Sequence, residues 1–166
     1  MSSQERDGKE WYVADWSPLG WLETAIKVIA LTLGIAAAVR ALSGGGIALP
    51  GGLRLAQLVV QGLLSLGLIA AIFDRLAERE IVAMVFVIVN NLGHWAMVLA
   101  LASEMGPGRL LLGFAGLMLL GDLVKLGFLL GHPEFTVRDT PRSALYGLTL
   151  FYVAGYVLIL IFELLR

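Results

Sequence analysis

The residues with the greatest chemical potential in this sequence are three polar side chains close together in a long apolar stretch. Asn90, Asn91 and His94 lie near the middle of residues 81–102, and both asparagines come within one helical turn of the histidine. A polar side chain in hydrocarbon is costly, so it usually faces protein or water and is a candidate functional group. His94 could relay protons, ligate haem or bind a polar headgroup. The alternative is a structural histidine whose hydrogen bonds are satisfied.

Charged residues form two further pairs at helical spacing. Glu23 and Lys27 are four residues apart with the glutamate first, which is the favourable order on a helix. Asp122 and Lys125 are three residues apart. One interpretation is that each pair neutralises itself within its own helix, with Lys27 reaching toward the membrane surface. The other is pairing between helices, either Glu23 with Lys125 or Asp122 with His94.

Polar residues also recur on one face of two other apolar stretches. These stripes are Gln57, Gln61 and Ser65 in the first stretch, and Thr149, Tyr152, Tyr156 and Glu163 in the second. They are expected to form interhelical hydrogen bonds or to line a cavity, except for Glu163, which is close enough to the chain end to be solvated. The candidate residues of a ligand or ion pathway are therefore Asn90, Asn91, His94, Asp122, Lys125, Glu23, Lys27, Gln61, Tyr152 and Tyr156.

Several kinds of chemistry do not fit the composition. The chain has no cysteine and only two histidines, so thiolate sites and zinc sites have too few ligands. His132 lies at the end of a helix and His94 near a midpoint, which argues against haem held by both within one chain. No phosphate loop or hydrolase motif occurs, so no catalytic residue and no metal ligand is assigned, and the cofactor is unknown. A formal net charge of -1 gives no basic field for nucleic acid.

The elements that position these residues are apolar segments. Of the 166 residues, 58% are apolar and 15% charged, and the mean hydropathy is +0.85. Soluble domains are about 25% charged. Five segments reach the roughly 20 residues that a transmembrane helix needs: 18–42, 53–73, 81–102, 109–130 and 143–165. We expect an all-α integral membrane bundle of five transmembrane helices with short loops and no soluble domain, in which residues 1–17 form an N-terminal interfacial segment and 18–166 the transmembrane domain.

Local signals predict where the helices begin and how they are connected. Ser17 is expected to cap a helix with Pro18 at its first position. Residues 74–80 contain strong helix formers and should extend the second helix before a sharp turn into the third. Because the turn at 106–108 is tight, we expect the third and fourth helices to be antiparallel neighbours. On the first helix, Ala30, Gly34 and Ala38 continue the face of Lys27 and should contact protein.

The distribution of basic residues between the loops indicates an orientation. Six lie on the N-terminal side (Arg6, Lys9, Arg75, Arg79, Arg138 and Arg142) and four on the other side (Arg40, Arg54, Arg109 and Arg166). This excess favours a cytoplasmic N-terminus and an external C-terminus. We expect the protein in the inner, or plasma, membrane of a bacterium or archaeon.

Three functions follow from these observations. The first is an accessory subunit of a larger membrane complex, because the chain is almost without loops, has no catalytic motif and has several small-residue faces. Its partners would be lipid together with other membrane proteins, or copies of itself. The alternative is a small transporter or a proton- or ion-conducting protein that uses the polar cluster at the midplane. The third is a membrane enzyme that binds a lipid or cofactor.

Overall fold

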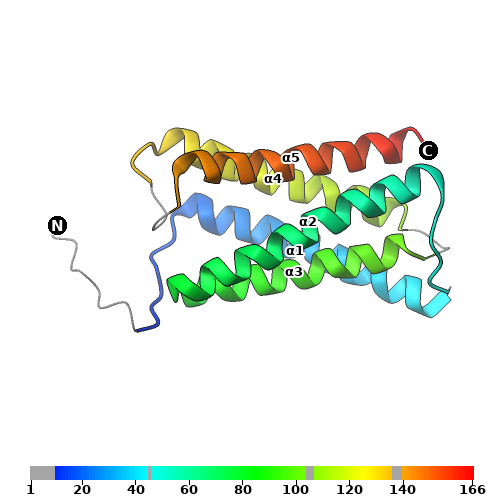
Figure 1. Cartoon of the computed structure of the whole chain (residues 1–166), viewed down its shortest axis with the longest axis horizontal. Helices are drawn as coiled ribbons and strands as arrows, with labels where there is room; N and C mark the ends of the chain where they lie inside the picture. Colours follow the sequence, from blue (N-terminus) through cyan, green and yellow to red (C-terminus); the bar gives the residue numbers. More distant parts are fainter. Residues whose placement is uncertain (1–9, 45, 104–106, 136–139) are drawn as a thin grey trace.

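The fold is a bundle of long helices. The computed structural model describes residues 10–44, 46–103, 107–135 and 140–166. Within these residues there are five helices, each long and apolar enough to cross a membrane, so the predicted all-α membrane bundle is confirmed (Figure 1). They are α1 (Pro18–Gly44), α2 (Gly52–Glu78), α3 (Ile81–Leu101), α4 (Arg109–Gly131) and α5 (Arg142–Leu164).

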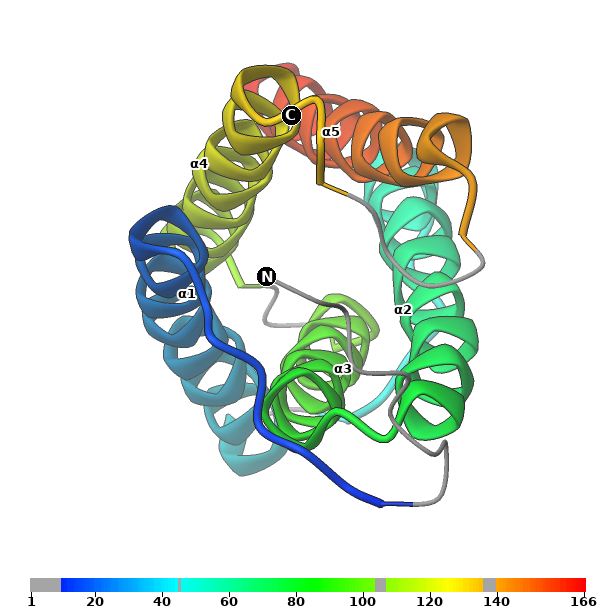
Figure 2. The same cartoon turned by 90° about the vertical axis from the view of Figure 1, so that its left-hand side faces the viewer.

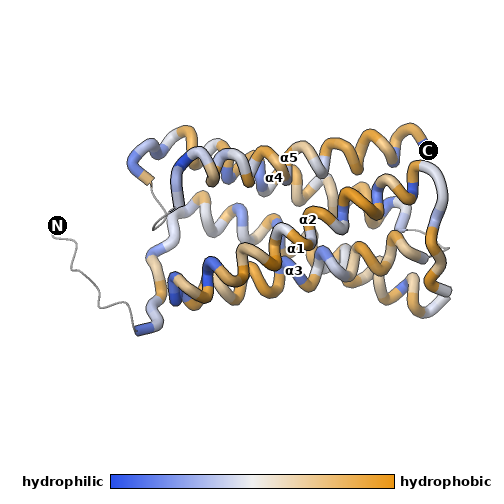
Figure 3. Tube along the Cα trace, in the orientation of Figure 1, coloured by the Kyte–Doolittle hydropathy of each residue, from blue (hydrophilic) through white to orange (hydrophobic). Residues whose placement is uncertain are grey.

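Apolar residues predominate along the helices, with hydrophilic residues gathered toward one end of the bundle (Figure 3). Large aliphatic side chains such as Val39, Leu63, Leu130 and Ile161 are exposed on the outside of the bundle. A soluble monomer rarely exposes contiguous apolar patches above a few hundred Å². The surface therefore suits lipid tails, while polar side chains concentrate toward one end and inside.

The helices close into a ring. The extensive helix contacts are α1 with α4 and α3, α2 with α3 and α5, and α4 with α5. Each helix thus packs against two others, in the ring order α1, α4, α5, α2, α3, as seen along the bundle in Figure 2. Successive helices run in opposite directions, so every neighbouring pair is antiparallel except α1 and α3, which are parallel (Figure 1).

The expectation that α3 and α4 are neighbours is wrong. α1 contacts both helices and lies between them. The physical reason is the length of the connection, residues 102–108, since seven extended residues span about 23 Å and neighbouring helix axes lie only about 8–10 Å apart. The 45–51 connection from α1 to α2 has the same length. The two connections meet at one end of the bundle, where the Ala48 amide donates to the Ala102 carbonyl at 2.8 Å.

The connection between α2 and α3 is short and has the sharp turn that the sequence predicts. Arg79 adopts a left-handed backbone conformation with φ of 57°, which ends α2. Glu80 then caps α3, because its carboxylate accepts from the Val82 and Ala83 amides. Two residues thus reverse the chain, and α2 and α3 are antiparallel neighbours.

The N-terminal segment lies across this turn. Tyr12 accepts from the Ile81 amide at 3.0 Å and its own amide donates to the Arg79 carbonyl at 3.1 Å. The Trp16 ring packs edge-on against Phe86 at 6.0 Å between centroids. Ser17 accepts from the Gly20 amide at 3.1 Å, which is the expected cap of α1. Residues 1–9 of the expected interfacial segment lie outside the described residues.

Glycines allow α1 and α3 to approach closely. A Cβ added at Gly34 would lie 3.0 Å from the Gly93 carbonyl oxygen and 3.2 Å from the Phe114 ring, and one added at Gly93 would lie 2.2 Å from Leu31. Ala30 and Ala38 on the same face of α1 are buried. This face contacts protein because small residues let the backbones come together.

We predict that Gly34→Leu destabilises the bundle by about 1–3 kcal/mol, because the new side chain overlaps α3 and Phe114. The matched control is Gly62→Leu on α2, where no atom lies within 4 Å of an added Cβ. The measurement is thermal unfolding of each purified variant in the same detergent. Equal melting temperatures for the two variants would contradict the packing described here.

Candidate functional site

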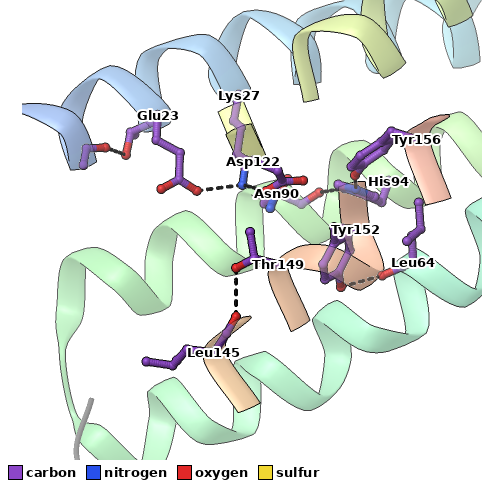
Figure 4. Close-up of polar contacts among 12 residues, drawn as sticks. Glu23, Lys27, Leu64, Asn90, His94, Asp122, Leu145, Thr149, Tyr152 and Tyr156 are labelled. Atoms are coloured by element: carbon purple, nitrogen blue, oxygen red, sulfur yellow. Dashed lines mark hydrogen bonds and ion pairs between the residues drawn. The ribbon is translucent and has the colours of Figure 1, made fainter. Parts of the chain in front are cut away.

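The centre of the polar interior is a buried ion triad. The Lys27 ammonium lies 2.7 Å from Glu23 Oε1 and 2.6 Å from Asp122 Oδ1 (Figure 4). Lys27 is 5% exposed and Asp122 is 4% exposed. Buried charges of this kind are tolerated only with close partners, because their separate desolvation is expensive. The pair therefore fixes α1 against α4.

The partner of Asp122 differs from both sequence-based possibilities, which were Lys125 and His94. It is Lys27, because α1 packs against α4. Gly121 makes the space: a Cβ there would lie 3.0 Å from the Cγ and Cε atoms of the lysine. Lys27 therefore stays inside the bundle and does not extend to the membrane surface.

Lys125 is not part of the triad. Among the described residues it forms no hydrogen bond and no ion pair within 4.0 Å, and its side chain is partly exposed. It lies within Coulombic range of Glu23 and Asp122. Two carboxylates and two ammonium groups therefore lie in this region. Their formal charges sum to zero for the set of Glu23, Asp122, Lys27 and Lys125.

His94 is fully buried and both of its ring nitrogens are engaged. Nδ1 lies 2.8 Å from the Asn90 carbonyl oxygen, and Nε2 contacts the Tyr156 hydroxyl (Figure 4). A carbonyl only accepts, so the neutral ring carries its proton on Nδ1 and Nε2 accepts from the Tyr156 hydroxyl. The rings of Phe114, Tyr152 and Tyr156 surround the imidazole at 5.5 to 6.3 Å between centroids.

Three other candidates act as interhelical hydrogen-bond donors to backbone carbonyls. Tyr152 donates to Leu64 at 2.8 Å, Asn91 donates to Ser65 at 2.9 Å, and Gln61 donates to His94 at 3.4 Å. Each side chain is buried. These bonds attach α5 and α3 to α2, so Asn91 and Tyr152 hold the ring together.

Sequence reasoning missed two residues at the far end of the interior. Glu163 was expected to be solvated, but its side chain is 9% exposed and accepts from Gln57 Nε2 at 2.8 Å. Gln57 is fully buried and was left out of the candidate residues. The sequence signal for both residues is the helical spacing of the two polar stripes to which they belong, because these stripes of α2 and α5 face each other where the helices pack.

The polar residues form a file that runs nearly the length of the bundle. Glu23 lies about 8 Å along α1 from its start, and His94 about 20 Å along α3 from the same end. Gln57 lies about 8 Å from the start of α2, which is at the opposite end. We call this set the polar file: Glu23, Lys27, Asp122, Asn90, His94, Tyr156, Gln61, Gln57 and Glu163.

The hydrogen bonds along the polar file are interrupted at two places, which we call its breaks, and unpaired oxygens lie at both. Between the ion triad and His94, Asp122 Oδ2 and Asn90 Oδ1 are buried without a hydrogen-bond partner, and Figure 4 shows Asn90 beside the Lys27–Asp122 pair. Between Gln61 and Gln57 the two Oε1 atoms are likewise unpaired. A buried acceptor without a donor is costly, and in protein interiors an ordered water usually supplies the donor.

Metal binding has no geometric support in the described part of the chain, where no group of three His, Asp or Glu side chains is placed to hold an ion. His132, the second histidine, is exposed and lies 3.0 Å from Glu134 Oε1. Hydrogen bonds from its own backbone amide and from His132 lower the pKa of Glu134. This pair lies outside the membrane-spanning segments and is separate from the polar file.

We predict that Lys27→Met destabilises the protein by about 3–5 kcal/mol, because it leaves Asp122 buried without its counter-charge. The double variant Lys27→Met, Asp122→Leu should recover part of that loss. Lys125→Met is the matched control, since it removes the same charge from a side chain outside the triad. The free energy of unfolding is measured by titrating mixed micelles with a denaturing detergent. Additive losses in the double variant would contradict the pairing.

Comparisons with known proteins give no relative: no family model, no curated protein and no solved structure matches this chain.

Proposed function

We propose that this protein conducts protons from one side of the membrane to the other through the polar file. The observation that carries the proposal is the file itself, which extends from Glu23 to Glu163 inside a closed ring of helices. Each of its breaks is flanked by two unpaired oxygens. Such oxygens suit a water molecule that bridges them and passes a proton along.

The residues of the polar file have the chemistry for this transfer. Glu23 has a side chain 16% exposed and lies near one end of the bundle, so it can exchange protons with solvent. Asp122 holds Lys27 through Oδ1 and leaves Oδ2 to take up a proton. At the centre, the Tyr156 oxygen takes up a proton from one side as its hydroxyl proton passes to His94 Nε2. The imidazolium then returns that proton to the Tyr156 oxygen, which releases the other proton to the far side, so both groups are restored while Nδ1 stays bonded to the Asn90 carbonyl.

The packing of the centre favours protons over larger ions. Phe114, His94 and Tyr156 are each 0% exposed and contact one another, so they fill the cross-section. A hydrated ion needs an open lumen, whereas a proton needs only a chain of hydrogen bonds. In the orientation favoured by the loop charges, the Glu23 end faces the cytoplasm.

We expect Asp122→Asn to lower proton flux at least roughly tenfold, because asparagine keeps an acceptor for Lys27 but cannot take up a proton. The control is Asp74→Asn, which removes an exposed carboxylate at the end of α2 and should leave the flux unchanged. Flux is followed with a pH dye trapped in proteoliposomes under an imposed potassium diffusion potential.

A second variant separates conduction from folding. Tyr156→Phe keeps the ring and removes the hydroxyl on His94, so flux should fall at least roughly tenfold, whereas stability should fall only by the roughly 1–3 kcal/mol of one unpaired buried nitrogen. Replacing sodium with choline should not alter the flux of the unmodified protein. No flux above empty liposomes, or equal flux in Asp122→Asn and Asp74→Asn, would refute the proposal.

A second candidate function, the accessory subunit, is favoured by the outer face of α4. Gly127 and Gly131 are exposed, and no atom lies within 4 Å of a Cβ added to either. They form a small-xxx-small pair of the kind that transmembrane helices use for close contact. The small residues Gly34, Gly93, Gly121 and Gly155, by contrast, are used within the bundle.

For this second candidate, Gly127→Leu should reduce co-purification with a partner helix or second copy, because its side chain fills the open space beside Gly131 that a close helix contact needs. Gly147→Leu on α5 is the control, since that position is equally exposed and open. Native mass spectrometry after gentle extraction gives the readout. An identical assembly state in both variants would contradict a contact through this face.

A further inference from the structure

A pocket of about 550 Å³ opens at the end of the bundle opposite Glu23. It lies between residues 48–51, the start of α2, Ser103 just after the end of α3, and the residues that follow α5. Its volume is in the range of small-molecule sites. None of the proposed steps of proton transfer uses it.

The polar part of the pocket is cationic. Arg54 and Arg166 line it together with Ser103, and no acidic residue is among the lining residues. The Arg54 Nε atom is buried and has no hydrogen-bond partner, so the guanidinium has an unused donor inside the protein. Glu163 approaches Arg166 at 3.6 Å but also accepts from Gln57, so it neutralises the two arginines only in part.

The backbone adds further donors at the same place. Gly51 caps α2 without any side-chain hydrogen bond, so the amides of the first turn of a 27-residue helix have no side-chain partner. Free amides at a helix start, next to guanidinium groups, are suited to a phosphate group. The cavity, the unpaired Arg54 nitrogen and the second arginine together indicate an anion.

The remaining lining residues suggest the source of that anion. Leu49, Leu53 and Leu165 line the pocket and are exposed. The pocket lies where helices that span the bilayer end, which is the depth of lipid headgroups. A free phosphate ion would gain nothing from these leucines, whereas the acyl chains of a lipid would cover them. Basic pockets between transmembrane helices bind anionic headgroups by this combination.

We propose that this pocket binds a phosphate group, supplied by the headgroup of an anionic phospholipid, with Arg54 as the principal contact and Arg166 as the second. The proposal is independent of proton conduction. It would hold if the polar file were only structural.

The test is native mass spectrometry of the full chain with defined lipids. Phosphatidylglycerol should bind more tightly than phosphatidylcholine, and Arg54→Gln should weaken phosphatidylglycerol binding by roughly tenfold, because a charge-assisted contact is lost. Arg40→Gln is the matched control: it removes the same charge at the same end of the bundle, from an exposed side chain outside the pocket.

A second arm distinguishes the source of the phosphate. Thermal unfolding in a lipid-free neutral detergent is followed with inorganic phosphate and with short-chain phosphatidylglycerol. Stabilisation by the lipid alone, lost in Arg54→Gln and kept in Arg40→Gln, supports the proposal. Stabilisation by inorganic phosphate with the same dependence on Arg54 overturns the lipid assignment. Equal weakening of lipid binding in both variants, or in neither, overturns the site.

Discussion

The contact between Lys27 and Asp122 is the interaction on which the rest of the bundle depends. Neither charge can face lipid, so both must lie inside, and they neutralise each other only if α1 lies beside α4. α1 then lies on one side of α4 and α5 on the other, so α3 packs against α1 and the ring closes through α2. Two glycines make this packing possible. Gly121 leaves room for the side chain of Lys27, and Gly34 leaves room for the backbone of α3.

The interior combines two classes of polar contact with different consequences. Donors such as Asn91 and Tyr152 end on backbone carbonyls of neighbouring helices, which holds the ring together. Asp122, Asn90, Gln61 and Gln57 each keep a buried oxygen without a donor. A purely structural network would be expected to use all its acceptors, because each unused one costs stability. Gln61 and Gln57 belong to both classes, since they also donate to backbone carbonyls of neighbouring helices, whereas Asp122 and Asn90 present their unpaired oxygens beside the ion triad.

Much of the fold follows from the sequence, because hydrophobic length and capping residues are local properties. The five spans, the cap at Ser17 and the turn at Arg79 and Glu80 depend on neighbours within a few residues. The burial of Asn90 and His94 also follows, since the cost of exposing them to lipid is independent of the helix order. The order itself does not follow: connections of seven residues reach a second neighbour as easily as a first. The partner of Asp122 and the burial of Glu163 depend on that order, so periodicity alone could not give them.

An odd number of helices in a closed ring also has a consequence for biosynthesis. One neighbouring pair must be parallel, and here it is α1 with α3. The two neighbours of α1 in the finished bundle are α3 and α4, so the first helix made does not pack against the second as a hairpin. Both of its eventual neighbours emerge from the ribosome later, and Asp122 follows Lys27 by 95 residues. During that interval the acid four residues before Lys27, Glu23, is the counter-charge that the same helix face provides. Glu23 thus allows the lysine to enter the bilayer before its permanent partner exists.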